Sequence, residues 1–319
     1  MHHLKHLKIL LSLLLTALIS LTCVSCCWTC IISNTELSDI DTGTYKSWKN
    51  VTTITSNRTS IKIVPYNGGQ IVSYAYSDVN ILAPIYDQID ISSNNEKKKI
   101  IFKDRCNSKV YEPNTVLLSN TIDSSYELEF FQKYSMLLEH GDVKISQFLG
   151  NNSEDTMSLN LSNNTFLKSG GYFIVPLSVI SKLPNRWTYL DRKKVQPNNK
   201  DFVHIFDDNL IFHATGGNPG IATDSNSGWF VYIWKDLFFF KKFSYGSRGK
   251  YPDKFTIEVT ESHESLMVKT PSPLLCIPPG DSRTFTQKLG LLKLHEEVTS
   301  IDGAIKAFYS LHLPLLLER

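Results

Sequence analysis

Short runs of β-branched and aromatic residues recur along the chain between residues 48 and 293, and this rhythm constrains the fold more than any other feature. Turn residues, such as Asn-Gly-Gly at 67–69, separate the runs at intervals of roughly 8 to 15 residues. Runs of this length and spacing are typical of an antiparallel sandwich or barrel. Strands do not alternate with helical patterns, which argues against a doubly wound α/β fold. The sequence therefore predicts an all-β domain.

The composition is that of a folded domain. Apolar residues make up 42% of the 319-residue chain, which is enough for a full core and excludes wholesale disorder. The 33 basic and 31 acidic residues leave a formal net charge of +2. The longest basic run, residues 97–99, stands in a Ser/Asn-rich stretch that we interpret as a solvated hairpin tip. This balance gives no electrostatic reason to expect nucleic acid as a partner.

The N-terminus has the layout of an export signal. Lys5 and Lys8 precede an apolar run over residues 9–21, and a basic segment followed by such a run is typical of a secretory signal. The run is shorter than the ~20 residues of a membrane-spanning helix, although an extension to residue 32 would reach that length. We expect residues 1–25 to be a signal peptide, with an uncleaved anchor as the alternative.

Four cysteines follow this run, and the small Ser25 stands directly before Cys26. The arrangement resembles a relaxed bacterial lipobox, which predicts Cys26 as a lipid-modified mature N-terminus and residues 26–47 as an anchor and linker. Cleavage without lipidation and palmitoylation of these cysteines stay open as alternatives. We expect no metal here, because zinc ligands need a folded frame around them. The expected location is therefore outside the cytoplasm, at the cell envelope or membrane, with the lipid as membrane contact.

The body of the chain reads as one domain over residues 48–294, followed by a helix and tail over residues 295–319. Ser300 is placed to cap that helix, and one face of it is apolar, with Ile301, Ala304, Ile305 and Phe308. The Gly-rich residues 215–220 lack the Lys-Ser/Thr ending of a phosphate loop, so the sequence predicts no cofactor.

Two further cysteines, Cys106 and Cys276, lie in this body. They could form one disulfide in an oxidising compartment, and two buried free thiols are the alternative.

One expected strand presents an acid. In residues 254–260, Ile257 and Val259 point to one side, while Glu258 points to the other together with two threonines. The second side is polar enough to face solvent or a wet cleft. Glu258 is therefore either a plain surface acid or a cleft carboxylate.

Three stretches together resemble a known superfamily. Residues 61–84 read IKIVPYNGGQIVSYAYSDVNILAP, residues 170–187 read GGYFIVPLSVISKLPNRW, and residues 227–292 contain GWFVYIWKDLFFFKKF, YPDKFTIEV and KTPSPLLCIPPGDSRTFTQKLGLL. In this order they resemble galactose-mutarotase-like domains, and most closely the uncharacterised domain-of-unknown-function family 4380. The resemblance covers residues 48–294 and implies a β-supersandwich of two large antiparallel sheets, one of them concave.

The resemblance also implies a carbohydrate ligand on the concave sheet. Mutarotases use a His as general acid and a Glu as general base, because the anomeric hydroxyl loses a proton while the ring oxygen gains one. His213 and Glu258 are our catalytic candidates for these roles. His204 is a weaker candidate, because its apolar neighbours favour a core or edge position, and we expect His263 on a polar hairpin. A catalytic pair should face one pocket with the two side chains about 6–8 Å apart.

The matching motifs also contain candidate ligand-binding residues. Carbohydrate sites stack sugars on aromatic rings and hydrogen-bond their hydroxyl groups with polar side chains. The candidates are Asn80, Trp187, Lys241, Tyr251 and Asp253. Relatives carry a Gly-Gly-His-Arg-Leu-Trp-like element after the first stretch, whereas this chain reads IYDQIDISSNNEKKKIIF there, without His or Arg.

Three functions are compatible with these features. We rank first an exported, lipid-anchored protein that binds a carbohydrate without catalysis. A structural envelope protein that has lost the ligand site comes second, and the missing His-Arg element favours it. A sugar epimerase that uses Glu258 and His213 comes third, because fold resemblance alone does not carry an activity over.

Overall fold

The computed structural model describes residues 39–56, 58–84, 88–93, 99–101, 106–121, 127–137, 140–190 and 202–317. The chain divides into two compact units, Met1–Leu37 and Ser38–Arg319, and all described residues belong to the second unit. The predicted signal peptide, the lipidation site at Cys26 and the first part of the predicted linker lie outside the described residues. Within the described ranges, no helix has the length and apolar character needed to cross a membrane.

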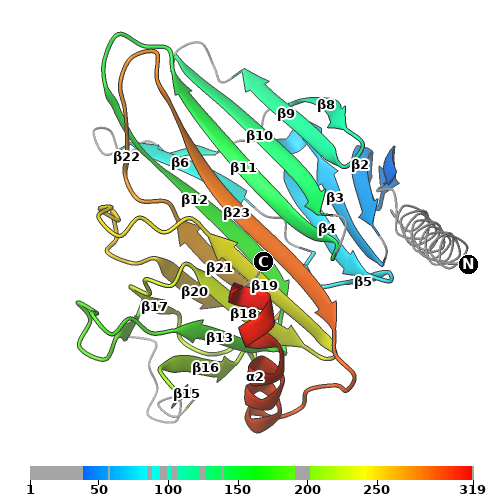
Figure 1. Cartoon of the computed structure of the whole chain (residues 1–319), viewed down its shortest axis with the longest axis vertical. Helices are drawn as coiled ribbons and strands as arrows, with labels where there is room; N and C mark the ends of the chain where they lie inside the picture. Colours follow the sequence, from blue (N-terminus) through cyan, green and yellow to red (C-terminus); the bar gives the residue numbers. More distant parts are fainter. Residues whose placement is uncertain are drawn as a thin grey trace, which may run out of the picture. The chain divides into compact units, whose positions relative to one another are not determined.

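The largest layer is an antiparallel sheet of ten strands in the order β15-β16-β13-β18-β19-β23-β11-β10-β9-β8 (Figure 1). Its strands are β8 (Asn107–Glu112), β9 (Thr115–Thr121), β10 (Leu128–Leu137), β11 (Asp142–Asn151), β13 (Tyr172–Pro176), β15 (Val203–Phe206), β16 (Asn209–His213), β18 (Trp229–Trp234), β19 (Leu237–Phe243) and β23 (Ser282–Lys293). The last strand in the sequence, β23, lies in the middle of this sheet, between β19 and β11.

A second antiparallel sheet follows the order β14-β17-β20-β21-β12-β6-β7, and β22 pairs with β12 beside this path. Its strands are β6 (Gln88–Ser93), β7 (Lys99–Ile101), β12 (Met157–Lys168), β14 (Trp187–Tyr189), β17 (Ile221–Thr223), β20 (Ile257–Glu261), β21 (Ser265–Pro271) and β22 (Leu275–Ile277). These two large antiparallel sheets confirm the predicted all-β architecture.

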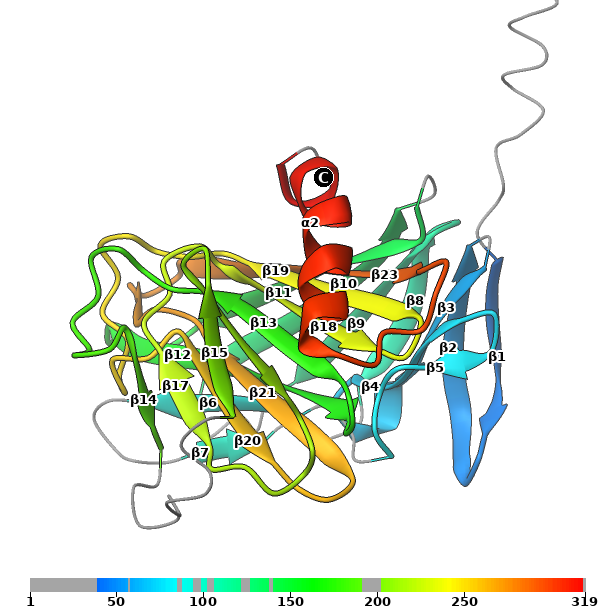
Figure 2. The ribbon, with the colours of Figure 1, turned by 90° about the horizontal axis from the view of Figure 1, so that it is seen from below.

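The N-terminal part of the unit forms a third sheet, of five strands in the order β1-β2-β3-β4-β5. Its elements are β1 (Asp39–Tyr45), β2 (Trp48–Ser56), β3 (Thr59–Val64), the short 3-10 helix η1 (Pro65–Asn67), β4 (Gln70–Tyr76) and β5 (Val79–Asn80). Figure 2 shows this sheet at the end of the sandwich where β8 and β9 lie.

The folded unit begins earlier than the sequence predicts. Residues 39–45, which we assigned to the linker, form β1 and pair with β2. Most of the β1 side chains are exposed, and only Ile40 and Tyr45 pack against apolar clusters. A strand that is held mainly by its backbone hydrogen bonds leaves little apolar pattern in the sequence, so this one was missed.

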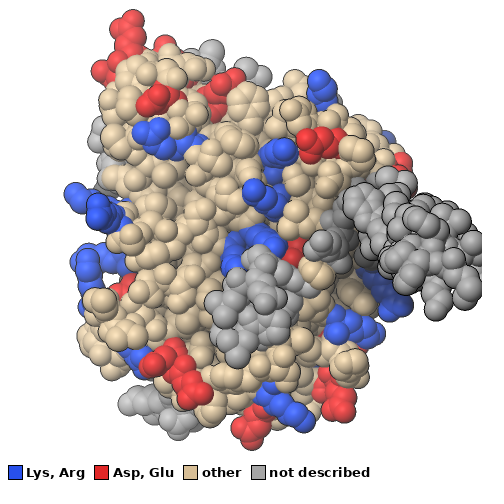
Figure 3. Space-filling model, in the orientation of Figure 1, with Lys and Arg blue, Asp and Glu red and all other residues tan. Residues whose placement is uncertain are grey.

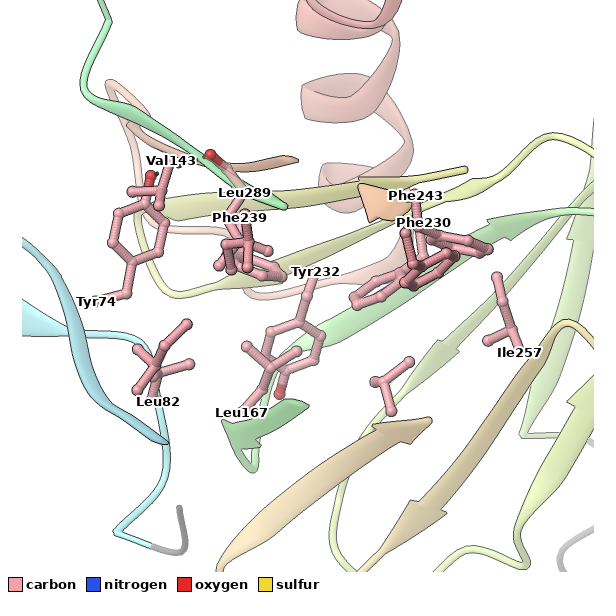
Figure 4. Close-up of a cluster of buried hydrophobic side chains, with 14 of the residues drawn as sticks. Tyr74, Leu82, Val143, Leu167, Phe230, Tyr232, Phe239, Phe243, Ile257 and Leu289 are labelled. Atoms are coloured by element: carbon pink, nitrogen blue, oxygen red, sulfur yellow. Dashed lines mark hydrogen bonds between the residues drawn. The ribbon is translucent and has the colours of Figure 1, made fainter. Parts of the chain in front are cut away.

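The core lies between the two large sheets. Alternation along β18 sends Phe230 and Tyr232 inward and places Val231 on the opposite side of the sheet. Figure 4 shows Tyr232 and Phe239 of the ten-stranded sheet together with Leu167 of β12 in this interior. The four inward side chains, Phe230, Tyr232, Phe239 and Leu167, are fully buried, as expected for a closely packed interior.

The outer side of the ten-stranded sheet carries a second apolar cluster, and helix α2 (Ile301–Leu317) covers it (Figure 2). Ala304 and Phe308 of the helix are fully buried there. The predicted cap is confirmed, because the Gly303 N–H donates to the Ser300 Oγ at 3.1 Å. Burial of one helix face on a sheet is the usual way in which such an apolar stripe is stabilised.

Neither Cys106 nor Cys276 forms a disulfide. Cys276 is exposed in β22, beside the eight-stranded sheet, whereas Cys106 is buried directly before β8 of the ten-stranded sheet. The structure therefore excludes the disulfide, and it corrects the alternative as well, because only one of the two thiols is buried.

Candidate functional site

A row of polar side chains crosses the eight-stranded sheet on the face that points away from the core. Ile257 and Val259 of β20 are buried in the core, so Glu258 between them points outward. The register places Glu258 of β20, Lys269 of β21 and Asn164 of β12 opposite one another on consecutive strands. We call Glu258, Lys269 and Asn164 the polar row. Glu258 and Lys269 are the partly exposed members of the row, whereas Asn164 is buried, at 6% exposed.

Lys269 holds two carboxylates at this row. Its Nζ lies 2.7 Å from Oε1 of Glu258 and 3.2 Å from Oδ2 of Asp253. The side chains of Lys269 and Glu258 are 23% and 15% exposed, whereas that of Asp253 is 62% exposed. Burial alone lowers the pKa of Lys269, but the hydrogen bond and charge of Glu258, followed by those of Asp253, outweigh it and raise this pKa. The row therefore presents a cationic donor beside an anionic acceptor.

The loop between β19 and β20 carries Tyr251 and Asp253 to this region. Tyr251 stacks on Tyr245 with ring centroids 5.9 Å apart and an interplanar angle of 9°. Its hydroxyl accepts a hydrogen bond from the Gly246 N–H at 3.2 Å, and burial raises the pKa of Tyr251. The Leu274 N–H donates to the Lys250 carbonyl at 2.7 Å, which ties the loop to the chain after β21. The structure thus brings Asp253 and Glu258 together at Lys269, with Tyr251 two residues before Asp253 in the same loop.

The predicted acid–base pair is not assembled. His213 lies opposite Tyr172 in the register and stacks on its ring, with centroids 4.6 Å apart. Tyr172 belongs to the cluster under α2, so His213 is on the outer side of the ten-stranded sheet. Glu258 is on the outward face of the other large sheet. The two side chains therefore do not face one pocket, and the prediction of a His213–Glu258 couple is wrong.

Two further candidates have structural roles within the chain. The Asn80 Oδ1 accepts hydrogen bonds from the Tyr74 N–H at 3.0 Å and the Leu82 N–H at 3.1 Å, so this amide fixes the end of β5. Trp187 stands in β14, the first strand in the order of the eight-stranded sheet, and packs against the core with Tyr189. Neither side chain lies in the polar row.

Lys241 points into the interior between the large sheets. It is 2% exposed, and its Nζ donates to Thr165 Oγ1 at 2.9 Å. Three glutamines line the same enclosed space, namely Gln132, Gln147 and Gln287. The space measures about 30 Å³, which is room for about two water molecules. It is therefore too small for a sugar ring, and Lys241 is a buried polar residue rather than a surface ligand contact.

Sequence reasoning missed Lys269 and Asn164. Lys269 could have been found from the hairpin between β20 and β21. The polar turn at residues 262–264 sets the register of the two strands, and this register places Lys269 opposite Glu258. Asn164 gave no such signal, because β12 is polar on both faces at this point. Among the described residues, no group of three His, Cys, Asp or Glu side chains could hold a metal ion.

The charges on the helix-covered side of the molecule are dispersed. Figure 3 shows basic and acidic side chains interspersed over this face, with neutral residues over most of its area. This pattern agrees with the net charge of +2.

Comparison with solved structures identifies the fold. A galactose mutarotase-like protein from Lactobacillus casei aligns over 76% of this chain and 100% of its own length, with a TM-score of 0.55 and 12% identity. A galactose mutarotase-related enzyme from Lactobacillus acidophilus aligns over 78% and 100%, with a TM-score of 0.54 and 9% identity. A galactose mutarotase-like protein from Clostridium acetobutylicum aligns over 82% and 100%, with a TM-score of 0.52 and 11% identity.

The chain therefore has the galactose-mutarotase-like fold, as the sequence resemblance implied. No protein-family model matches the sequence, and no curated protein matches it either. The closer resemblance to the family 4380 thus stays a prediction. The structural alignments establish the fold. Because the sequence identities are only 9% and 11%, the activity has to be argued from the site.

Proposed function

We propose that this protein binds a carbohydrate on the outward face of the eight-stranded sheet, at the polar row and the adjoining Tyr251–Asp253 loop. The observation that carries the proposal is the Lys269–Glu258 pair. It holds an ammonium donor and a carboxylate acceptor 2.7 Å apart on an outward face. A sugar hydroxyl both donates and accepts hydrogen bonds, so it can bridge such a pair. The fold, shared with mutarotase-like proteins, supports the same class of ligand.

The proposal is binding without catalysis. Anomerisation needs a proton donor and a proton acceptor on one ligand. His213 is on the other large sheet, and the carboxylate of Glu258 is engaged by Lys269. These contacts support the binding protein over the epimerase.

We also propose that the protein is exported and lipid-anchored at Cys26. The support is the basic start, the apolar run over residues 9–21 and Ser25 before the cysteine. Labelling of cells with a radioactive fatty acid tests this part. We expect label in the wild-type protein and none in Cys26→Ser, and equal labelling of both would contradict it.

A glycan array with the full chain tests the carbohydrate ligand. We expect binding to at least one glycan, and an affinity about tenfold weaker for Glu258→Gln, because a hydrogen bond to a charged group contributes ~1.5–3 kcal/mol. Glu264→Gln is the matched control, since Glu264 is an exposed acid at the tip of the same hairpin. Absence of binding to every glycan would refute the proposal and favour a structural envelope protein.

A further inference from the structure

A second concave region lies away from the polar row, where the five-stranded sheet meets the edge of the ten-stranded sheet. It is an open hollow of about 480 Å³. Its lining includes Thr42 of β1, Asn50 of β2, Tyr66 of η1, Cys106, and Asn107 and Ser108 of β8. The Cys106 N–H donates to the Pro65 carbonyl at 2.9 Å, which holds the two walls together. The volume falls within the ~300–1,000 Å³ of small-molecule sites.

The side chains around this hollow are neutral. Thr42, Tyr66 and Ser108 contribute hydroxyl groups, and Asn50 contributes an amide. Hydroxyls and amides each donate and accept hydrogen bonds. Recognition of a phosphate or a divalent cation uses charged side chains, and none lines the described part of the hollow. The lining therefore matches a neutral ligand that is rich in hydroxyl groups.

These polar groups are available to a ligand. Asn50 and Ser108 are exposed, and their side chains make no hydrogen bond with any other residue in the described ranges. They come from two different sheets, so a single bound molecule can contact them together. Backbone pairing places Ser108 opposite the buried Leu118 of β9, whereas Asn107 lies opposite Ser119 and points to the other side of the strand.

Tyr66 adds an aromatic surface. Its ring lies next to that of Trp48, with centroids 5.7 Å apart, and its hydroxyl accepts a hydrogen bond from the Lys49 N–H at 3.3 Å. These two contacts orient the ring before any ligand arrives. An amphipathic ring of this kind packs against the apolar face of a sugar while leaving its hydroxyl edge to polar groups.

We propose that this hollow is a second, independent site that binds one neutral saccharide unit. The class of ligand rests on the proposed function. The location of the site rests on the volume of the hollow and on its neutral lining. Tyr66 supplies the stacking surface. Asn50 and Ser108 supply hydrogen bonds from the two walls.

Titration of the full chain with D-galactose, D-glucose, D-mannose and N-acetylglucosamine, followed by saturation-transfer NMR, tests the site. We expect at least one sugar to bind about tenfold more weakly to Asn50→Ala, and not at all to Ser108→Trp, whose indole fills the hollow. Lys109→Ala is the matched control, because Lys109 follows Ser108 on β8, is exposed and does not line the hollow. Its affinity should equal that of the wild type. Circular dichroism melts should be the same for all variants.

Parallel titration of Glu258→Gln separates the two sites. If Glu258→Gln weakens binding and neither Asn50→Ala nor Ser108→Trp does, the proposed site in the hollow is refuted and the polar-row site stands. If only Asn50→Ala and Ser108→Trp weaken binding, the site in the hollow stands and the polar-row site is refuted. If none of the four sugars binds to the wild type, the proposed site in the hollow is refuted. The glycan array then tests carbohydrate binding at the polar row separately.

Discussion

The ammonium of Lys269 and the carboxylate of Glu258 lie directly opposite each other on β21 and β20, 2.7 Å apart. Opposite charges at facing positions of an antiparallel pair stabilise the sheet by roughly 0.2–1 kcal/mol. Both side chains are less than one quarter exposed, so solvent screens this pair less than a surface ion pair. The pair therefore belongs both to the hairpin and to the proposed binding face.

Lys269→Met should change how stability depends on alkaline pH. The pKa of Lys269 is raised in the folded protein, so its stabilising contribution is complete below the unfolded value of about 10.4 and is lost as pH rises through the folded value. Urea unfolding at about pH 8 and about pH 11 measures this. The wild type should be more stable than the variant at the lower pH, and the difference should shrink at the higher one. A stability difference between the wild type and Lys269→Met that is the same at both pH values would contradict the raised pKa of Lys269.

Tyr232→Phe should destabilise the fold by about 1–3 kcal/mol, because it leaves two buried backbone groups without their partner. The Tyr232 hydroxyl donates to the Lys168 carbonyl at 2.6 Å and accepts from the Gly171 N–H at 2.8 Å. Urea denaturation gives the difference in the free energy of unfolding. Tyr111→Phe is the control, because Tyr111 is 60% exposed, and it should change the stability little. Equal stability of both variants would mean that the Tyr232 contacts are unimportant.

Gly290→Ala should destabilise the protein by about 1–3 kcal/mol or more, as expected when a core is overpacked. A Cβ at Gly290 would stand 2.0 Å from Phe240 Cε1 and 2.8 Å from Asp142 Oδ1. Gly43→Ala is the control, since nothing lies within 4 Å of its Cβ position. Thermal melts of the two variants should separate clearly, and identical melting temperatures would be inconsistent with this packing.

Thiol titration should distinguish Cys106 from Cys276. Cys276 is exposed and Cys106 is buried, and neither forms a disulfide. In the native full chain, Cys276→Ser should therefore remove one fast-reacting thiol, whereas Cys106→Ser should leave the fast-reacting count unchanged. After denaturation each substitution should lower the total by one. Loss of a fast-reacting native thiol in Cys106→Ser would show that this residue is accessible.

The alternation of side chains along single strands could be predicted from the sequence. Ile257 and Val259 are inward and Glu258 outward, as their period of two indicates. The Ser300 cap was likewise a local signal and is confirmed. Such features depend only on neighbours in the chain.

The assembly of the site depends on contacts between distant strands, which no local pattern reveals. His213 and Glu258 have the right chemistry for an acid–base couple, yet they are on different sheets. Lys241 and Lys242 are adjacent in the sequence, and only the order of the sheets shows that Lys241 points into the interior. Family resemblance supplied the fold, and sheet register decided which side chains meet.

The central position of β23 has a consequence for the order of folding. This strand pairs with β11, from the first half of the chain, and with β19, from the second half. Until residues 282–293 have been synthesised, the ten-stranded sheet consists of two separate pieces with unpaired edges. Pairing between strands this far apart in sequence is slow to form. Completion of the sheet is thus delayed until β23 has been synthesised, so the two pieces keep exposed edges for longer than a sheet built from consecutive hairpins would.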